Sequence, residues 1–104
     1  MLSLKMRRHS LPERIALFVE PMECAPVSKL PGGSQWVYEI KLDGYRAVAV
    51  KSDRVTLYSR RQKPFTQYPQ MVQVLRDLPN GTVLDGEIVA LDDEGRPNFN
   101  LLQH

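Results

Sequence analysis

The chain has 104 residues, of which 42% are hydrophobic and 25% charged, and its formal net charge is +2. This is the composition of a globular protein of at most one domain, and so small a charge is no argument in itself for nucleic-acid binding. The single cysteine, Cys24, excludes an internal disulfide and a cysteine-based metal cluster, and we expect it to be a small buried thiol. No apolar run is long enough to span a membrane, so the interior of the cell is the expected compartment.

The first 17 residues are expected to form a leader that precedes the domain, which takes up residues 18–104. Within the leader, residues 1–9 are basic, and Ser10-Leu11-Pro12-Glu13 has the form of a capping box with proline in the first turn. That pattern predicts the start of a short helix. Further along, residues 31–34 read Pro-Gly-Gly-Ser and predict a turn or loop.

Two runs of alternating β type, residues 36–41 and 46–51, flank the pair Asp43-Gly44. This pattern predicts an antiparallel hairpin, because the tight turn of a hairpin needs a positive φ that glycine adopts at little cost. In the resulting register Lys41 lies opposite Arg46, and Glu39 lies opposite Val48.

Two cations opposite each other on a sheet repel. Either both side chains extend into water at the end of the hairpin, which is the more common arrangement, or an anion such as a phosphate lies between them. A nearby positive charge and partial desolvation favour the neutral form of a lysine, which is its nucleophilic form. Lys41 is therefore a candidate acceptor of a phosphoryl or nucleotidyl group.

The remaining elements suggest an α+β fold, with a mostly antiparallel twisted sheet and at least one packed helix. Residues 52–54 predict a turn, 55–58 a strand and 59–63 a basic loop. Residues 67–78 predict a helix, whose core stripe at helical spacing is Met71, Val74, Leu75 and Leu78. Residues 82–91 predict a strand, 92–97 a charged turn, and 98–104 the start of another helix.

In the strand at 82–91, Asp85 and Glu87 are expected on one face because side chains alternate along a strand. Gly86 between them predicts a close approach to the backbone. The carboxylates either form an ion pair with a neighbouring lysine or arginine, or contact a ribose hydroxyl or a divalent cation near Lys41. Mg²⁺ often takes one or two carboxylates together with phosphates and water.

Three motifs resemble those of the covalent nucleotidyltransferases, in the order in which that superfamily carries them. Residues 41–46 fit the signature Lys-x-Asp-Gly-x-Arg, residues 59–61 stand where the family has a short Ser-Arg motif, and residues 84–88 read Leu-Asp-Gly-Glu-Ile. Residues 18–22 and 99–103 also resemble the ligase domains of bacterial end-joining DNA ligases. The chain is therefore similar, over residues 18–103, to part of the adenylation domain of ATP-dependent DNA ligases.

The resemblance implies a role for each matching residue. Lys41 would attack the α-phosphorus of ATP and hold AMP, and Glu39 would lie beside the adenine. Arg46 would hold the ribose or a phosphate, Arg60 would reach a phosphate of the nucleotide or of the nicked strand, and Glu87 would bind the ribose or the metal. The implied cofactors are ATP and Mg²⁺ or Mn²⁺, and the implied partner is nicked or broken double-stranded DNA.

Two departures from the family pattern qualify these roles. Arg61-Gln62 stands where relatives often have Asn-Gly, and the later motifs and the OB-fold domain do not appear in the sequence. We therefore expect residues 18–104 to be the N-terminal portion of an adenylation domain, weakly active or inactive alone. The missing ligase half or end-joining proteins are the expected partners, and the expected location is the cytoplasm of a bacterium, at the nucleoid.

Two alternatives stay open from the sequence. The first is a capping-type guanylyltransferase or an RNA ligase, although residues 99–103 disfavour capping. The second is a non-catalytic remnant that binds nucleotide or DNA and depends on a partner chain.

Overall fold

A computed structural model describes residues 15–104 of the chain. It has three strands, β1 (Tyr45–Lys51), β2 (Val55–Ser59) and β3 (Thr82–Ile88), and one α-helix, α1 (Pro69–Val74). Two short 3₁₀ helices are η1 (Leu75–Asp77) and η2 (Phe99–Leu102). The predicted capping box at residues 10–13 and most of the predicted leader lie outside the described residues.

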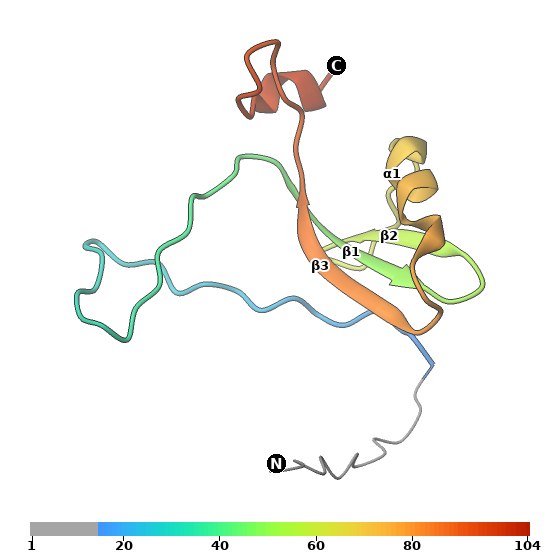
Figure 1. Cartoon of the computed structure of the whole chain (residues 1–104), viewed down its shortest axis with the longest axis horizontal. Coiled ribbons are helices and arrows are strands. Elements are labelled where there is room, and N and C mark those ends of the chain that lie inside the picture. The colour runs from blue at the N-terminus through green and yellow to red at the C-terminus, as the bar shows by residue number, and fades with distance from the viewer. Residues whose placement is uncertain (1–14) are drawn as a thin grey trace, which may run out of the picture.

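The strands form one antiparallel sheet in the order β2-β1-β3, and α1 lies on one side of it (Figure 1). The central strand β1 alternates alanine and valine over residues 47–50, and these residues are buried because both faces of the sheet are covered there. The small antiparallel sheet with a packed helix agrees with the α+β class predicted from the sequence. Among the described helices, none has the length and apolar character that crossing a bilayer requires.

The predicted hairpin is wrong. Residues 36–41 form no strand, and β1 pairs with β2 and β3 instead, so that Arg46 lies opposite Glu87 and Val48 opposite Asp85. The alternating run at 36–41 lies in a long irregular excursion, residues 15–44, that leaves the sheet and returns at β1 (Figure 1). Ile40 there is 90% exposed, because no sheet face covers it. An alternating pattern shows that a segment suits a strand, but it does not identify the partner.

Gly44 has a different role from the one predicted. A Cβ at Gly44 would lie 2.1 Å from the carbonyl oxygen of Ile88, so β3 approaches the backbone there too closely for any side chain. At Gly86, where close approach was predicted, an added Cβ would meet nothing within 4 Å. The close approach to glycine therefore occurs at the entry to β1, not in the middle of β3.

The helix is shorter than predicted, and its core stripe is different. Pro69 opens α1, and the chain tightens into η1 after Val74. Within α1 and η1, Val72 and Leu75 pack on the sheet, whereas Val74 is 70% exposed. The change of helix type alters the rotation per residue, so the spacing expected for a regular helix no longer gives the buried face.

The strand predicted at 82–91 ends at Ile88 as β3, because the following residues pair within their own turn. Leu91 bridges to Pro97, and the amide of Asn98 donates to the carbonyl of Ala90 at 2.8 Å. The predicted charged turn is confirmed: the Asp92 carboxylate accepts from the amides of Glu94 and Arg96, each at 2.9 Å, and Gly95 has a φ of 75°. The helix expected at 98–104 is the 3₁₀ helix η2.

The two faces of the sheet carry separate apolar clusters. On the side of α1, the buried residues are Ala47, Ala49, Leu57 and Ile88, with Phe65, Tyr68, Val72, Leu75 and Leu102 against them. On the opposite side they are Ala16, Val48 and Val50, with Phe18, Tyr58 and Val83. Residues 15–18 of the excursion therefore help to cover the face that α1 leaves open.

Val48 is the best-buried side chain of the second cluster, with 1% of its surface exposed. Replacing it by alanine removes two methyl groups and leaves a cavity, so we expect Val48→Ala to lower the free energy of unfolding by about 2 kcal/mol. The measurement is the urea unfolding midpoint by circular dichroism. Val37→Ala is the matched control, because Val37 is 85% exposed and should change stability by less than about 0.5 kcal/mol. Equal effects of the two substitutions would contradict this description of the core.

Candidate functional site

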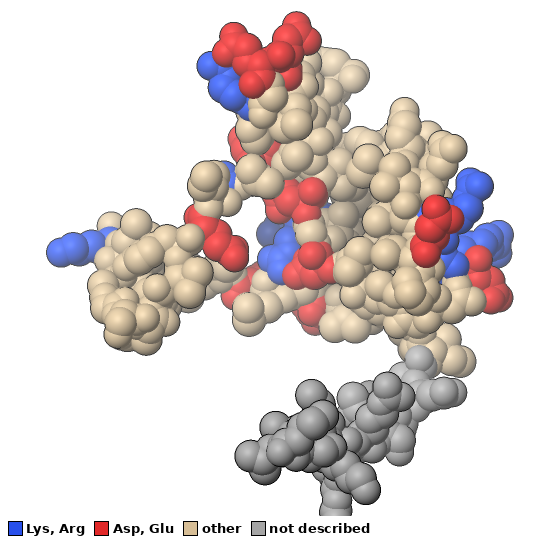
Figure 2. Space-filling model, viewed as in Figure 1, with Lys and Arg blue, Asp and Glu red and all other residues tan. Residues whose placement is uncertain are grey.

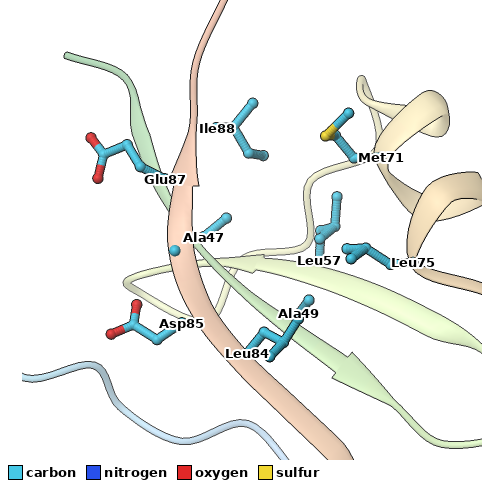
Figure 3. A pocket seen from close by; sticks show the side chains of 10 residues that line it. Ala47, Ala49, Leu57, Met71, Leu75, Leu84, Asp85, Glu87 and Ile88 are labelled. Carbon is cyan, nitrogen blue, oxygen red and sulfur yellow. The ribbon is translucent and has the colours of Figure 1, made fainter. Parts of the chain in front are cut away.

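Antiparallel pairing brings the start of β1 and the ends of β2 and β3 to one edge of the sheet. Arg46 is the second residue of β1, Ser59 the last of β2, and Glu87 the last but one of β3. Arg46, Asp85 and Glu87 share the face opposite α1, as the register and the alternation of side chains require. Figure 3 shows the two carboxylates projecting from β3 on the side away from Leu84 and Ile88. The prediction that Asp85 and Glu87 share one face is confirmed.

Two open pockets adjoin at this edge, with volumes of about 500 and 590 Å³. Cys24, Lys41, Arg46 and Glu87 line both of them. We call the first the Arg60 pocket, which is completed by Pro21, Glu23, Gly44, Tyr45, Ser59 and Arg60. We call the second the Glu39 pocket, which is completed by Glu39, Ile40, Leu42, Asp85 and Gly86. Acidic and basic side chains gather where β3 faces the excursion (Figure 2).

The structure thus brings all five predicted site residues to this pair of pockets. Lys41, Arg46 and Glu87 line both, Arg60 lines one, and Glu39 lines the other. They come together although the predicted register was wrong, because the excursion carries residues 39–41 past the edge of the sheet. Lys41 and Arg46 are not cross-strand partners, but they do face the same space.

Arg46 is held by three hydrogen bonds. Its Nε donates to Asp85 Oδ1 at 2.9 Å, its Nη2 donates to Asp85 Oδ2 at 2.5 Å, and its Nη1 donates to the Met22 carbonyl at 2.8 Å. The two-pronged pairing lowers the pKa of the Asp85 carboxyl and raises the pKa of the Arg46 guanidinium. Of the two alternatives for Asp85, the structure shows the ion pair.

Glu87 is directly opposite Arg46 but, within residues 15–104, takes part in no ion pair. No group of three carboxylate, histidine or cysteine side chains in that range is arranged to hold a metal ion. Glu87, which lines both pockets together with Lys41, has the chemistry to give one ligand to an ion that is bound mainly by phosphates and water.

The loop at 59–63 positions Arg60 at the end of β2. The Ser59 hydroxyl accepts from the amides of Arg61 and Lys63, at 3.3 and 3.2 Å, and the Gln62 amide donates to the Ser59 carbonyl at 2.9 Å. Gln62 has a φ of 60°, the left-handed conformation that glycine adopts most easily. The loop is thus held by local hydrogen bonds, and Arg60 lines its pocket from a defined turn.

One wall of both pockets does not follow from the sequence. Cys24 is exposed and lines them, so the prediction of a buried thiol is wrong. The segment that carries it has no helix or strand, and Arg46 binds the carbonyl of Met22 within it. A contact to a backbone carbonyl leaves no residue pattern, so the only signal was the family likeness of residues 18–22.

The chain is similar in sequence to known proteins. The family described as "ATP dependent DNA ligase domain" matches residues 17–104. The multifunctional non-homologous end joining protein LigD of Pseudomonas aeruginosa is 39% identical over 85 residues, covering 79% of this chain and 10% of that protein. DNA ligase C of Mycobacterium tuberculosis is 39% identical over 88 residues, covering 82% of this chain and 24% of that protein.

A third relative is the SPbeta prophage-derived DNA ligase-like protein LigB of Bacillus subtilis, 33% identical over 85 residues, which cover 80% of this chain and 31% of that protein. The chain therefore spans between a tenth and a third of the length of these curated relatives. No solved structure matches the chain significantly.

Proposed function

The chain belongs to the ATP-dependent DNA ligase family, enzymes of the nucleotidyltransferase superfamily, and on that premise we propose that Lys41 is the residue that takes AMP from ATP. The Lys41 amine attacks the α-phosphorus, a nitrogen–phosphorus bond forms, and the bond to the leaving pyrophosphate breaks. AMP then passes to the 5′-phosphate of a DNA break, and the 3′-hydroxyl displaces it to seal the strand.

One observation carries the proposal: Lys41 and Arg46 from one stretch of the sequence, and Glu87 from a distant one, line the same two pockets. Nucleotidyl transfer needs a positioned nucleophile and cations where phosphate charge develops. Lys41 supplies the first. Arg60 and Arg46, which both line the Arg60 pocket, supply the second.

Arg46 retains donors for the nucleotide. A guanidinium has five N–H groups. Three of them bind Asp85 and Met22, which leaves two, one on each Nη nitrogen, for a ribose hydroxyl or a phosphate oxygen. Glu39 borders only the second pocket and would lie beside the adenine.

Glu87 would hold the divalent ion, Mg²⁺ or Mn²⁺, or the ribose. When bound, the ion supplies neutralising charge to the phosphates. The Glu87 carboxylate also places a negative charge in the pockets that Lys41 and Arg46 line. The pockets should therefore bind a nucleotide that carries a divalent cation more readily than an anion without one.

Incubating the purified chain with Mg²⁺ and ATP labelled at either the α- or the γ-phosphate tests the proposal. We expect slow covalent labelling from the α-position only, with a bond that mild acid breaks, as a phosphoramidate should. Labelling is expected to be slow because the pockets are open and few described cations face a triphosphate of charge near −4. Label from the γ-position would show a different chemistry and overturn the proposal.

Competition in the same assay addresses the nucleotide. We expect unlabelled ATP, but not GTP, to suppress labelling, whereas suppression by GTP would favour a capping-type guanylyltransferase. For the second step, transfer of label to a nicked DNA duplex compared with a nicked RNA duplex tests the proposed substrate. In a bacterial cell this reaction would take place at the nucleoid, with the rest of the ligase or end-joining proteins as partners.

A further inference from the structure

The two carboxylates of β3 differ in what they contact. Asp85 binds Arg46 through both of its oxygens, whereas Glu87, two residues further along the same face, takes part in no ion pair among residues 15–104. The Asp85–Arg46 pair is only partly exposed, with 45% and 32% of the side-chain surfaces accessible. Charge-assisted bonds of this two-pronged kind fix the plane of a guanidinium as well as its position.

The plane of the guanidinium matters because its third nitrogen holds the wall of the pockets. With Nε and Nη2 on Asp85, the Nη1 group is directed at the carbonyl of Met22. Cys24, two residues beyond Met22, lines both pockets. This stretch has no helix or strand of its own, and the hydrogen bond from Arg46 to the Met22 carbonyl attaches it to the sheet.

We propose that Asp85 is a positioning residue, which aims Arg46 so that Arg46 both faces the nucleotide and ties residues 22–24 to the sheet as the wall of the two pockets. The consequence for nucleotide binding rests on the proposed function. The attachment of residues 22–24 to the sheet through Arg46 does not depend on it.

Asparagine at position 85 has nearly the same shape but cannot replace the carboxylate. Its amide has one acceptor oxygen, and its NH₂ group would face a guanidinium N–H, so donor meets donor. A lysine at position 46 would keep the charge but lose the planar fork that reaches Asp85 and Met22 at once. Both substitutions should release the wall without removing an apolar contact.

The single cysteine makes this measurable without further engineering, because a nitroxide spin label on Cys24 reports the mobility of the wall. We expect Asp85→Asn to raise the mobile fraction of the label spectrum, Arg46→Gln to do the same, and the double variant to add nothing further. Asp92→Asn is the matched control, since Asp92 is bonded within its own turn to Arg96. It should leave the spectrum unchanged.

Protein without the spin label is then used to measure how covalent labelling depends on the ATP concentration. We expect Asp85→Asn to raise the ATP concentration needed for half-maximal covalent labelling by about fivefold, the loss of part of one charge-assisted hydrogen-bond set. An unchanged label spectrum in both Asp85→Asn and Arg46→Gln, or effects that add in the double variant, would overturn the positioning role. If the nitroxide spectra change as expected but the wild-type protein is not labelled covalently by ATP, the positioning role of Asp85 is supported and the proposed function is wrong.

Discussion

Replacing Lys41 by arginine should reduce covalent labelling by α-labelled ATP by about 1,000-fold or more, since the reaction loses its nucleophile. Arginine keeps the positive charge at the shared border of the two pockets, but a guanidinium stays protonated in proteins and has no free electron pair to attack phosphorus. The rate of label incorporation into the intact chain is the measurement.

Lys63→Arg is the matched control for this experiment. Lys63 belongs to the loop that carries Arg60, but it contributes its backbone amide to Ser59 and lines neither pocket. Its replacement should leave labelling unchanged. ATP binding by Lys41→Arg should also persist, since the positive charge remains. Labelling of Lys41→Arg at the wild-type rate would place the nucleophile on another residue.

Replacing Gly44 by alanine should destabilise the protein by about 1–3 kcal/mol, the usual cost of forcing an extra group into a closed space. The new Cβ would lie 2.1 Å from the Ile88 carbonyl oxygen and 2.9 Å from Val89 Cγ1, so the backbones of the β1 entry and the end of β3 must separate. Gly44 also lines the Arg60 pocket, so the same shift should weaken labelling by ATP. Urea unfolding and the labelling rate measure the two effects.

Gly86→Ala is the control for this substitution. It adds the same methyl group to the strand that Gly44 approaches, at a position where nothing lies within 4 Å of the new atom. We expect its free energy of unfolding to stay within about 0.5 kcal/mol of wild type. Equal destabilisation by the two alanines would show that close approach to β3 is not the reason for glycine at position 44.

The sequence predicted the elements that depend on local signals. The positions of β2 and β3, the charged turn at 92–97 and the loop at 59–63 follow from strand-forming residues bounded by turn residues. The pairing of β1 did not follow, because Asp43-Gly44 and the alternating run before it favoured a local hairpin. Contacts between residues about 40 apart in the chain, such as Arg46 with Glu87, have no local signature.

The choice of the candidate site residues did not depend on the predicted fold. The five residues were identified from motif likeness, which depends on spacing along the chain and not on strand register, so the error in pairing did not displace them. Which of the two carboxylates, Asp85 or Glu87, pairs with Arg46 could not be predicted, since either could have reached it from the same face. The excursion wall was missed because its attachment uses a main-chain oxygen.

The left-handed conformation of Gln62 bears on how Arg60 is presented. A residue with a side chain enters that region at a cost of about 1 kcal/mol, and here the cost is offset by the backbone amides that Ser59 gathers through its hydroxyl and carbonyl. In this loop the hydrogen bonds to Ser59 therefore stabilise a backbone conformation that glycine would adopt without such help. The conformation of the loop that carries Arg60 thus depends on the hydroxyl group of the preceding residue, Ser59.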